Sequence, residues 1–202
     1  GVLNKQKGKI IVTSGPTYEE IDDVKVVTNK SSGKQGRALA IELSARGYEI
    51  IYIHSASIDH IPGLDNVSFH SSNDLKNKII ENINNTDAIF MTAAVSDFTV
   101  KKSSGKISRS NGNITLEFIP NEDIIATIKT SYPEIKCIAF SAQVDDELNF
   151  NKINTKNVDY LVINNILKNN FGSDANKVSI IDHQHLIFES EELDKNEISR
   201  DI

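Results

Sequence analysis

Short apolar runs alternate with amphipathic stretches along most of this chain. Each run ends in small or polar residues, which is typical of buried strands. Strands are therefore predicted at 9–14, 48–54, 67–70, 87–92, 136–140 and 159–163. Apolar residues at helical spacing, with cap and stop residues beside them, predict helices at 34–46, 73–83, from 120–123 onward and at 145–154. This alternation indicates the α/β class, with a Rossmann-like, doubly wound and mostly parallel sheet.

Local residue types predict how these elements begin and end. Ser31 or Ser32 can cap the first helix and Gly47 can end it, while Ser72 or Asn73 can cap the second helix. The acidic stretch 18–27 is expected to be an irregular connector. Residues 98–113 are polar and rich in Lys, Ser and Gly, and an alternating strand is expected at 114–119. We expect a mobile active-site loop running into a hairpin arm, and a closing hairpin from 178–182 and 185–188.

Composition limits the class of protein. The 202 residues, with 39% hydrophobic and 25% charged content, suit one soluble domain over 1–202 with a flap or arm at about 98–119. No apolar run approaches the ~20 residues that a membrane span needs. The net charge is −6 and there is no basic stripe, which argues against a nucleic-acid partner. The single cysteine, Cys137, excludes an internal disulfide and fits a reducing cytoplasm.

Candidate chemistry is expected at the carboxyl ends of the strands, where such sheets bind ligands. A glycine turn with Gly33 and Gly36 enters the first helix there. It is not a P-loop, because Gln35 occupies the position of the Ser or Thr and no glycine stands five residues before Gly33. No dinucleotide fingerprint follows Gly15, which argues against NAD. A helix N-terminus suits phosphate, and an ordinary capped helix is the alternative.

Other polar residues have both a ligand-binding and a plain structural interpretation. Asp97 follows a strand end and can contact a ligand or only cap a loop. Cations cluster in the polar loop (Lys101, Lys102, Lys106 and Arg109), and Lys152 and Lys156 share one helical face. They can neutralise phosphates or only be solvated. Phe140, expected at a strand end, can stack on a base or pack in the core. The five histidines form no metal-ligand pair, and no nucleophile motif occurs.

An ordered series of motifs adds to this picture. VTSGPTYEEIDDVKVVTNKSSGKQG is followed by TAAVSDF, a loop containing GKI, IPNEDI, AFSAQ and KINTKNVDYLVINN. This series resembles bacterial phosphopantothenoylcysteine synthetase over about residues 9–188. In many bacteria that unit is fused to a flavin-dependent decarboxylase, so we expect the stand-alone form here.

The resemblance implies a ligase of coenzyme A biosynthesis. CTP would activate the carboxylate of 4'-phosphopantothenate as an acyl-cytidylate, with Mg²⁺ beside the triphosphate and pyrophosphate as product. The amine of L-cysteine would then attack, giving 4'-phosphopantothenoylcysteine and CMP. Positioning and charge neutralisation would carry the catalysis. ATP is the alternative nucleotide.

The resemblance also implies roles for matching residues. Asn29 and Lys106 would be catalytic, and Lys25, Asn29, Ala93 and Ala94 would contact phosphopantothenate. The nucleotide would be bound by Gly15, Ser31, Gly33, Gly36, Asp97, Asn121, Glu122, Asp123, Ile124, Phe140, Lys152 and Lys156. The metal ligands stay unassigned. The arm would make a homodimer and complete the site across it.

Two positions depart from the family pattern. Lys25 stands where the family usually has an arginine, and the two cations differ in phosphate geometry. Lys106 is followed by Ile107 and Ser108, so Arg109 would supply the second cation of the loop.

Two rival functions remain open. A short-chain-type oxidoreductase would need a Tyr-x-x-x-Lys pair together with a glycine fingerprint; Tyr132 and Lys136 have this spacing, but the fingerprint is missing. A non-catalytic nucleotide-binding module would bind nucleotide without turnover.

Overall fold

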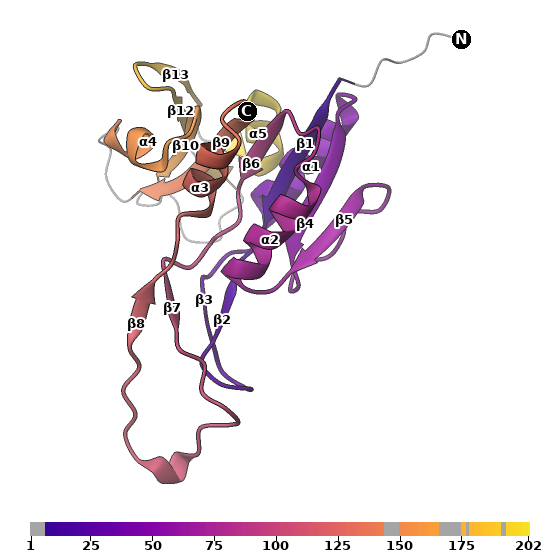
Figure 1. Ribbon diagram of the computed structural model, residues 1–202. Coiled ribbons are helices and arrows are strands. Elements are labelled where there is room, and N and C mark those ends of the chain that lie inside the picture. The colour runs from indigo at the N-terminus through magenta and orange to yellow at the C-terminus, as the bar shows by residue number, and fades with distance from the viewer. Residues whose placement is uncertain (1–6, 144–149, 166–174, 177, 191–192) are drawn as a thin grey trace.

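The computed structural model describes residues 7–143, 150–165, 175–176, 178–190 and 193–202 (Figure 1). Its centre is a sheet built from β1 (Lys9–Ser14), β4 (Glu49–Ser55), β5 (Asp65–Phe69), β6 (Ala88–Met91), β9 (Lys136–Gln143), β10 (Tyr160–Asn165), β12 (Val178–Ile181) and β13 (Leu186–Glu189). The strand order is β13-β12-β10-β9-β6-β1-β4-β5. Neighbouring strands in the series β10-β9-β6-β1-β4-β5 pair in parallel, whereas β12 and β13 add antiparallel at one edge.

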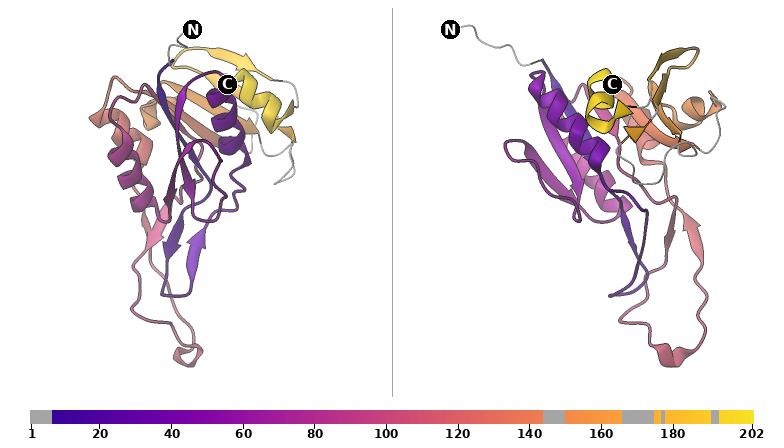
Figure 2. Two further views of the ribbon diagram at one scale, coloured as in Figure 1. Left: turned by 90° about the vertical axis from the view of Figure 1, so that its right-hand side faces the viewer. Right: turned by 180° about the vertical axis from the view of Figure 1, so that it is seen from behind.

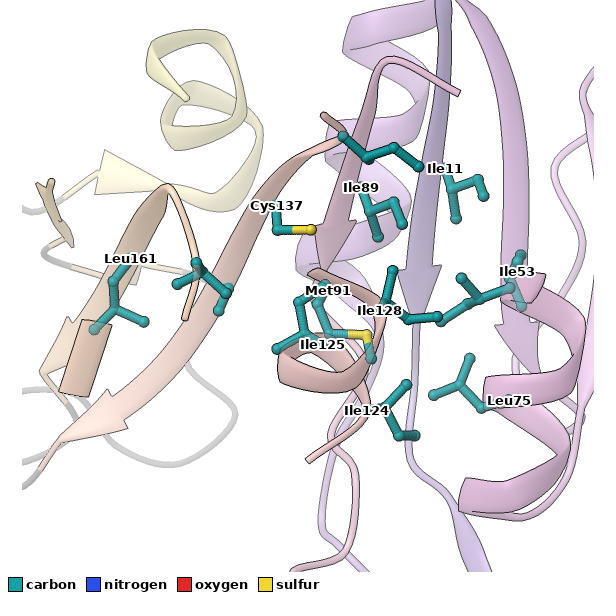
Figure 3. Close-up of a cluster of buried hydrophobic side chains, with 14 of the residues drawn as sticks. Ile11, Ile53, Leu75, Ile89, Met91, Ile124, Ile125, Ile128, Cys137 and Leu161 are labelled. Atoms are coloured by element: carbon teal, nitrogen blue, oxygen red, sulfur yellow. The ribbon is translucent and has the colours of Figure 1, made fainter. Parts of the chain in front are cut away.

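Helices cover both faces of this sheet (Figure 2). They are α1 (Lys34–Ala45), α2 (Ser72–Asn82), α3 (Ile124–Ser131), α4 (Asn151–Lys156) and α5 (Lys195–Asp201). Successive side chains of a strand point to opposite faces, so Val12 packs with Leu39 of α1 and Ile198 of α5. Ile11 packs in a second cluster, with residues of α2, α3 and α4 (Figure 3). The predicted doubly wound α/β fold is confirmed.

Two small hairpins project from the end of the sheet at which its parallel strands finish (Figure 1). We call residues 18–28 the hairpin, because β2 (Tyr18–Glu20) pairs antiparallel with β3 (Val26–Thr28). We call residues 98–120 the arm, because β7 (Phe98–Val100) pairs antiparallel with β8 (Phe118–Pro120) and η1 (Arg109–Asn111) lies between them. A third short pair joins β11 (Ala175–Asn176) to β14 (Leu193–Asp194). The first two hairpins therefore flank the carboxyl ends of the parallel strands.

Two expectations about these hairpins were wrong. Residues 18–27 are not an irregular connector, because the carboxylate of Asp22 accepts the N–H groups of Val24 and Lys25 and so forms a tight turn between two strands. The strand expected at 114–119 is confined to β8, which starts at Phe118. Its partner β7 lies inside the stretch that we expected to be loop.

The helix starts needed smaller corrections. Gly33, in a left-handed conformation, is the N-cap of α1, and neither Ser31 nor Ser32 takes that position. Ser71 caps α2, one residue before the expected Ser72 or Asn73. Asp123 caps α3 within the stretch that we expected to start this helix.

The later elements also differ from the prediction in extent. Of the helix expected at 145–154, residues 145–149 lie outside the described residues, and α4 runs from Asn151 to Lys156. The closing hairpin of β12 and β13 is confirmed. Helix α5 was not predicted, because its short polar sequence has no clear apolar period.

Candidate functional site

A cleft of about 1290 Å³ opens where β1, β6, β9 and β10 end. Five segments line it: the glycine turn at 28–36, the residues after β6 at 91–97, the start of α3 at 121–125, the end of β9 at 139–142, and two lysines of α4 with one asparagine of β10. These segments are far apart in the sequence. The parallel sheet brings them together, since the carboxyl ends of parallel strands meet at one edge.

The glycine turn is held against the end of β1. The hydroxyl of Ser14 donates to the carbonyl of Gly33 at 2.8 Å. Gly36 leaves space that a side chain would fill, because an added Cβ would lie 2.8 Å from both Cβ and Oγ of Ser14. Because Gly33 provides no side-chain cap, the first turn of α1 faces the cleft with backbone N–H groups and the positive end of the helix dipole. This arrangement suits a phosphate group.

The residues after β6 form the floor of the cleft beside Asn29. The side-chain amide of Asn29 donates to the carbonyls of Ala94, at 3.3 Å, and Val95, at 3.0 Å. The N–H of Ala94 donates to the carbonyl of Gly15 at 3.0 Å, although Gly15 itself does not line the cleft. Gly15 has a φ of 87° and packs on Ile58. Asn29 and Ala94 therefore share the cleft, and Gly15 supports their strand end from behind.

The segment before α3 is pinned to the same floor. Asn121 donates its backbone N–H to the carbonyl of Asp97 and its side-chain amide to the carbonyl of Ser96, both at 2.8 Å. Lys76 and Thr127 hydrogen-bond the carboxylate of Glu122 and hold its pKa below the usual range. Since that side chain is occupied, the segment would offer its backbone to a ligand.

Charged groups of both signs border the cleft. Lys152 and Lys156 line it from α4, and Nζ of Lys156 lies 3.0 Å from Oδ2 of Asp123. The exposed carboxylate of Asp97 makes no ion pair within the described residues. Those residues contain no group of three or more His, Cys, Asp or Glu able to hold a metal by themselves. Mg²⁺ commonly binds one or two carboxylates together with substrate phosphates, and the carboxylate of Asp97 fits that pattern, whereas the oxygens of Asp123 accept from the N–H of Ala126 and from Lys156.

Phe140 does not lie at a strand end as expected. Strand β9 continues to Gln143, so Phe140 pairs with Val162 inside the sheet. It lines the cleft and also packs against the buried cluster around α1 and α5. The lining of the cleft therefore includes one aromatic side chain.

Lys25 and Lys106 lie apart from the cleft. They line a second pocket of about 480 Å³ toward the outer end of the arm, beside η1, together with Arg109. Nζ of Lys25 lies 2.7 Å from the carboxylate of Asp22. Lys106 and Arg109 make no ion pair within the described residues. One chain therefore carries two separate groups of the expected site residues.

The cleft also contains residues to which the sequence assigned no role. Ser141 and Asn164 line it from β9 and β10, and their positions near strand ends were the available signal. Gln35 lines it too, and its side-chain amide donates to the hydroxyl of Ser199 at 2.9 Å. That contact joins the glycine turn to α5, which the sequence pattern did not reveal.

Fold and cleft together define a class: a doubly wound α/β domain whose switch-point cleft suits a phosphate-bearing ligand. The family described as the DNA/pantothenate metabolism flavoprotein C-terminal domain matches residues 5–202, and the chain belongs to this family.

Individual relatives agree with this membership. The chain is 34% identical to the coenzyme A biosynthesis bifunctional protein CoaBC of Bacillus subtilis, over 85% of this chain and 44% of that protein. It is 31% identical to a cysteine/cysteine sulfinic acid decarboxylase of an unknown prokaryote, over 96% of this chain and 56% of that protein. The chain thus spans about half the length of the curated relatives it matches.

A solved structure matches over almost the full length. The crystal structure of the C-terminal domain of a CoaBC protein is 28% identical, with a TM-score of 0.77, covering 98% of this chain and 94% of that one. The predicted resemblance to the family is confirmed. Among the described residues, no helix has the length and apolar character to cross a bilayer.

Proposed function

We propose that this domain joins 4'-phosphopantothenate to L-cysteine, using CTP to activate the carboxylate. Family membership and the likeness to CoaBC proteins of coenzyme A biosynthesis support this assignment. The observation that carries it is the composition of the large cleft at the strand ends. It combines the N-terminus of α1, the amide of Asn29 and the lysines of α4.

The two chemical steps fit what these residues can do. In the first, a carboxylate oxygen of phosphopantothenate attacks the α-phosphorus of CTP, and pyrophosphate leaves. In the second, the amine of cysteine attacks the acyl carbon, loses a proton and releases CMP. Neither step needs an enzyme nucleophile, because both depend on orientation and on neutralising phosphate charge.

Each part of the cleft then has a role in the proposal. The N-terminus of α1, with Ser31, Gly33 and Gly36, would hold phosphates of the nucleotide. Lys152 and Lys156 would face its triphosphate. Asn29 would hold the acyl group beside Ala93 and Ala94. Phe140 would contact the base, and Asp97 the nucleotide or the Mg²⁺ that it brings. Mg²⁺ would neutralise phosphate charge when bound.

We also propose that the domain works as a homodimer formed through the arm. Phe98, Ile114, Phe118 and Ile119 are each about half exposed, at 45–49%. Phe98 and Phe118 contact edge to face on the arm, with ring centroids 6.4 Å apart. An exposed apolar cluster of this kind marks an association surface. Because Lys25 and Lys106 lie in a pocket of their own, an arm crossing a two-fold axis would bring them to the partner's cleft.

The test is pyrophosphate release from purified protein with 4'-phosphopantothenate and Mg²⁺. CTP would be compared with ATP, each with and without L-cysteine. Pyrophosphate release with CTP, followed on addition of cysteine by equal amounts of CMP and amide product, would support the ligase. Nucleotide binding without release, from folded protein, would overturn it and favour a binding module. Sedimentation of the same sample tests the dimer, and a cytoplasmic location stays a prediction.

A further inference from the structure

The turn of the hairpin contains a carboxylate that is closed off from solvent. The side chain of Asp22 has an exposed fraction of 0%. Burying a charged group is unfavourable unless it is paired and hydrogen-bonded. Asp22 meets this condition, because four donors converge on its two oxygens. Such a complete set of contacts requires the arm as well as the hairpin.

The two carboxylate oxygens of Asp22 have different partners. Oδ1 accepts the backbone N–H groups of Val24, at 2.8 Å, and Lys25, at 2.7 Å. These bonds are local and form the turn itself. Oδ2 accepts Nζ of Lys25, at 2.7 Å, and the backbone N–H of Ile107, at 2.9 Å. Oδ2 therefore contacts the arm, 85 residues away in sequence. We call the two hydrogen bonds of Oδ2, to Lys25 and to Ile107, the clasp.

Both backbone polar groups of Ile107 are held by this arrangement. Its N–H donates to Asp22, and its carbonyl accepts Nζ of Lys25 at 3.4 Å. The peptide bond to Ile107 is the one that begins at Lys106, so the backbone of Lys106 is fixed one bond away. The side chain of Lys106 stays in the pocket with Lys25 and Arg109.

The other contacts between the hairpin and the arm involve residues 99–103, which are farther from Lys106 along the arm than Ile107 is. The N–H of Ser103 donates to the carbonyl of Ile21 at 2.8 Å. Lys102 lies 2.7 Å from Glu20 and 3.3 Å from Asp23, and all three side chains are more than 40% exposed. Exposed ion pairs contribute little, at about 0–1 kcal/mol. Asp22 is the buried contact nearest to Lys106.

We propose that Asp22 is a positioning residue for Lys106. Its Oδ2 holds the arm against the hairpin, and this contact fixes the position of the Lys106 backbone relative to the hairpin. This inference rests on the proposed function of Lys106. The ion pair with Lys25 and the N–H of Ile107 hold the pKa of Asp22 well below its usual range. The carboxylate of Asp22 is therefore ionised at neutral pH.

The variant Asp22→Asn separates the two roles of the carboxylate. Its remaining oxygen can still accept from Val24 and Lys25, so the turn is kept. Its NH₂ group replaces Oδ2 and meets two donors, so the clasp is lost. We expect kcat to fall by a factor on the order of 10 to 100, as misplacement of a catalytic group does. The KM for CTP should change less than about twofold, because the nucleotide cleft is untouched.

Controls distinguish positioning from a general structural role. Lys102→Gln removes the exposed ion pairs between the same two segments and should leave kcat unchanged. Ile107→Pro removes the same N–H from the arm side and should reproduce the loss even if Asp22→Asn folds poorly. In a double-mutant cycle, Asp22→Asn should add no further loss to Lys106→Gln, because both act through one lysine. Multiplied losses would overturn the proposal.

Hydrogen exchange gives a readout that does not depend on turnover. The amide of Ile107 should be protected in the unchanged protein and exchange faster in Asp22→Asn. Continued protection with full activity would overturn the clasp while leaving the proposed function standing. If the unchanged protein shows no turnover, the proposed function fails, and the role of Asp22 toward Lys106 fails with it.

Discussion

The substitution Gly36→Ala tests how closely helix α1 approaches the sheet at the candidate site. In a helix interior, alanine is ordinarily more stable than glycine by about 0.5–1 kcal/mol. Propensity alone therefore predicts that Gly36→Ala raises the melting temperature. The structure predicts the opposite, because the new Cβ would overlap the side chain of Thr92 and approach Ser14 to 2.8 Å.

The surrounding atoms cannot easily move away. The hydroxyl of Thr92 is bonded to the carbonyl of Thr13, and that of Ser14 to the carbonyl of Gly33. Overpacking of this kind costs about 1–3 kcal/mol. After subtracting the propensity gain, Gly36→Ala should lose about 0–2.5 kcal/mol. For a chain of this size that is a fall in melting temperature of up to about 10 °C.

Thermal unfolding followed by circular dichroism measures this shift, and calorimetric titration with CTP measures its effect on the cleft. Displacing the N-terminus of α1 should weaken CTP binding by about tenfold, or 1.4 kcal/mol. Ser44→Ala is the matched control, since it changes propensity in the same helix away from the cleft. A melting temperature that rises in Gly36→Ala would refute the close approach.

Three further predictions concern single side chains. Asn29→Asp replaces an amide that donates to Ala94 and Val95 with a carboxylate that repels both carbonyls. Product formation should therefore fall on the order of 100-fold. An unchanged rate, with pyrophosphate and CMP still released in equal amounts, would contradict this prediction. Lys106→Gln should reduce CMP formation by a similar factor and leave the melting temperature unchanged, which activity and unfolding assays on one sample would show. Burial raises the pKa of Cys137 to about 11, so a thiol reagent at about pH 8 should react only after denaturation. Because the folded pKa is the higher one, this thiol favours the folded state below about pH 8.5, and that contribution is lost as the pH rises toward the folded value; rapid labelling of folded protein would refute the burial.

The sequence predicted the sheet because its strands are buried on both faces and read as plain apolar runs. It also predicted the position of the cleft, since strand ends such as Ala93-Ala94 are marked by small residues. It failed for the hairpin, because its turn depends on one carboxylate whose partners include an arm residue 85 positions away. Long-range contacts of this kind leave no local period.

The separation of Lys106 from the cleft was hidden for the same reason. Sequence order places Lys106 between two cleft segments, near Asp97 and Asn121. The structure instead holds the intervening chain against the hairpin, so Lys106 shares a pocket with Lys25. The position of Phe140 was missed for a simpler reason. Strand β9 continues three residues beyond the predicted strand end, to Gln143.

The strand order has a consequence for folding during synthesis. Strand β1 lies between β4 and β6, so one of its edges stays unpaired until β6 has left the ribosome. The half-sheet β5-β4-β1-β6, with α1 and α2, needs only residues up to Met91. The remaining strands β9, β10, β12 and β13 then join its open edge in the order in which they are translated. After that point the sheet grows only at the edge opposite β5, and each new strand covers the edge left by the one before it, which limits the aggregation that unpaired edges cause.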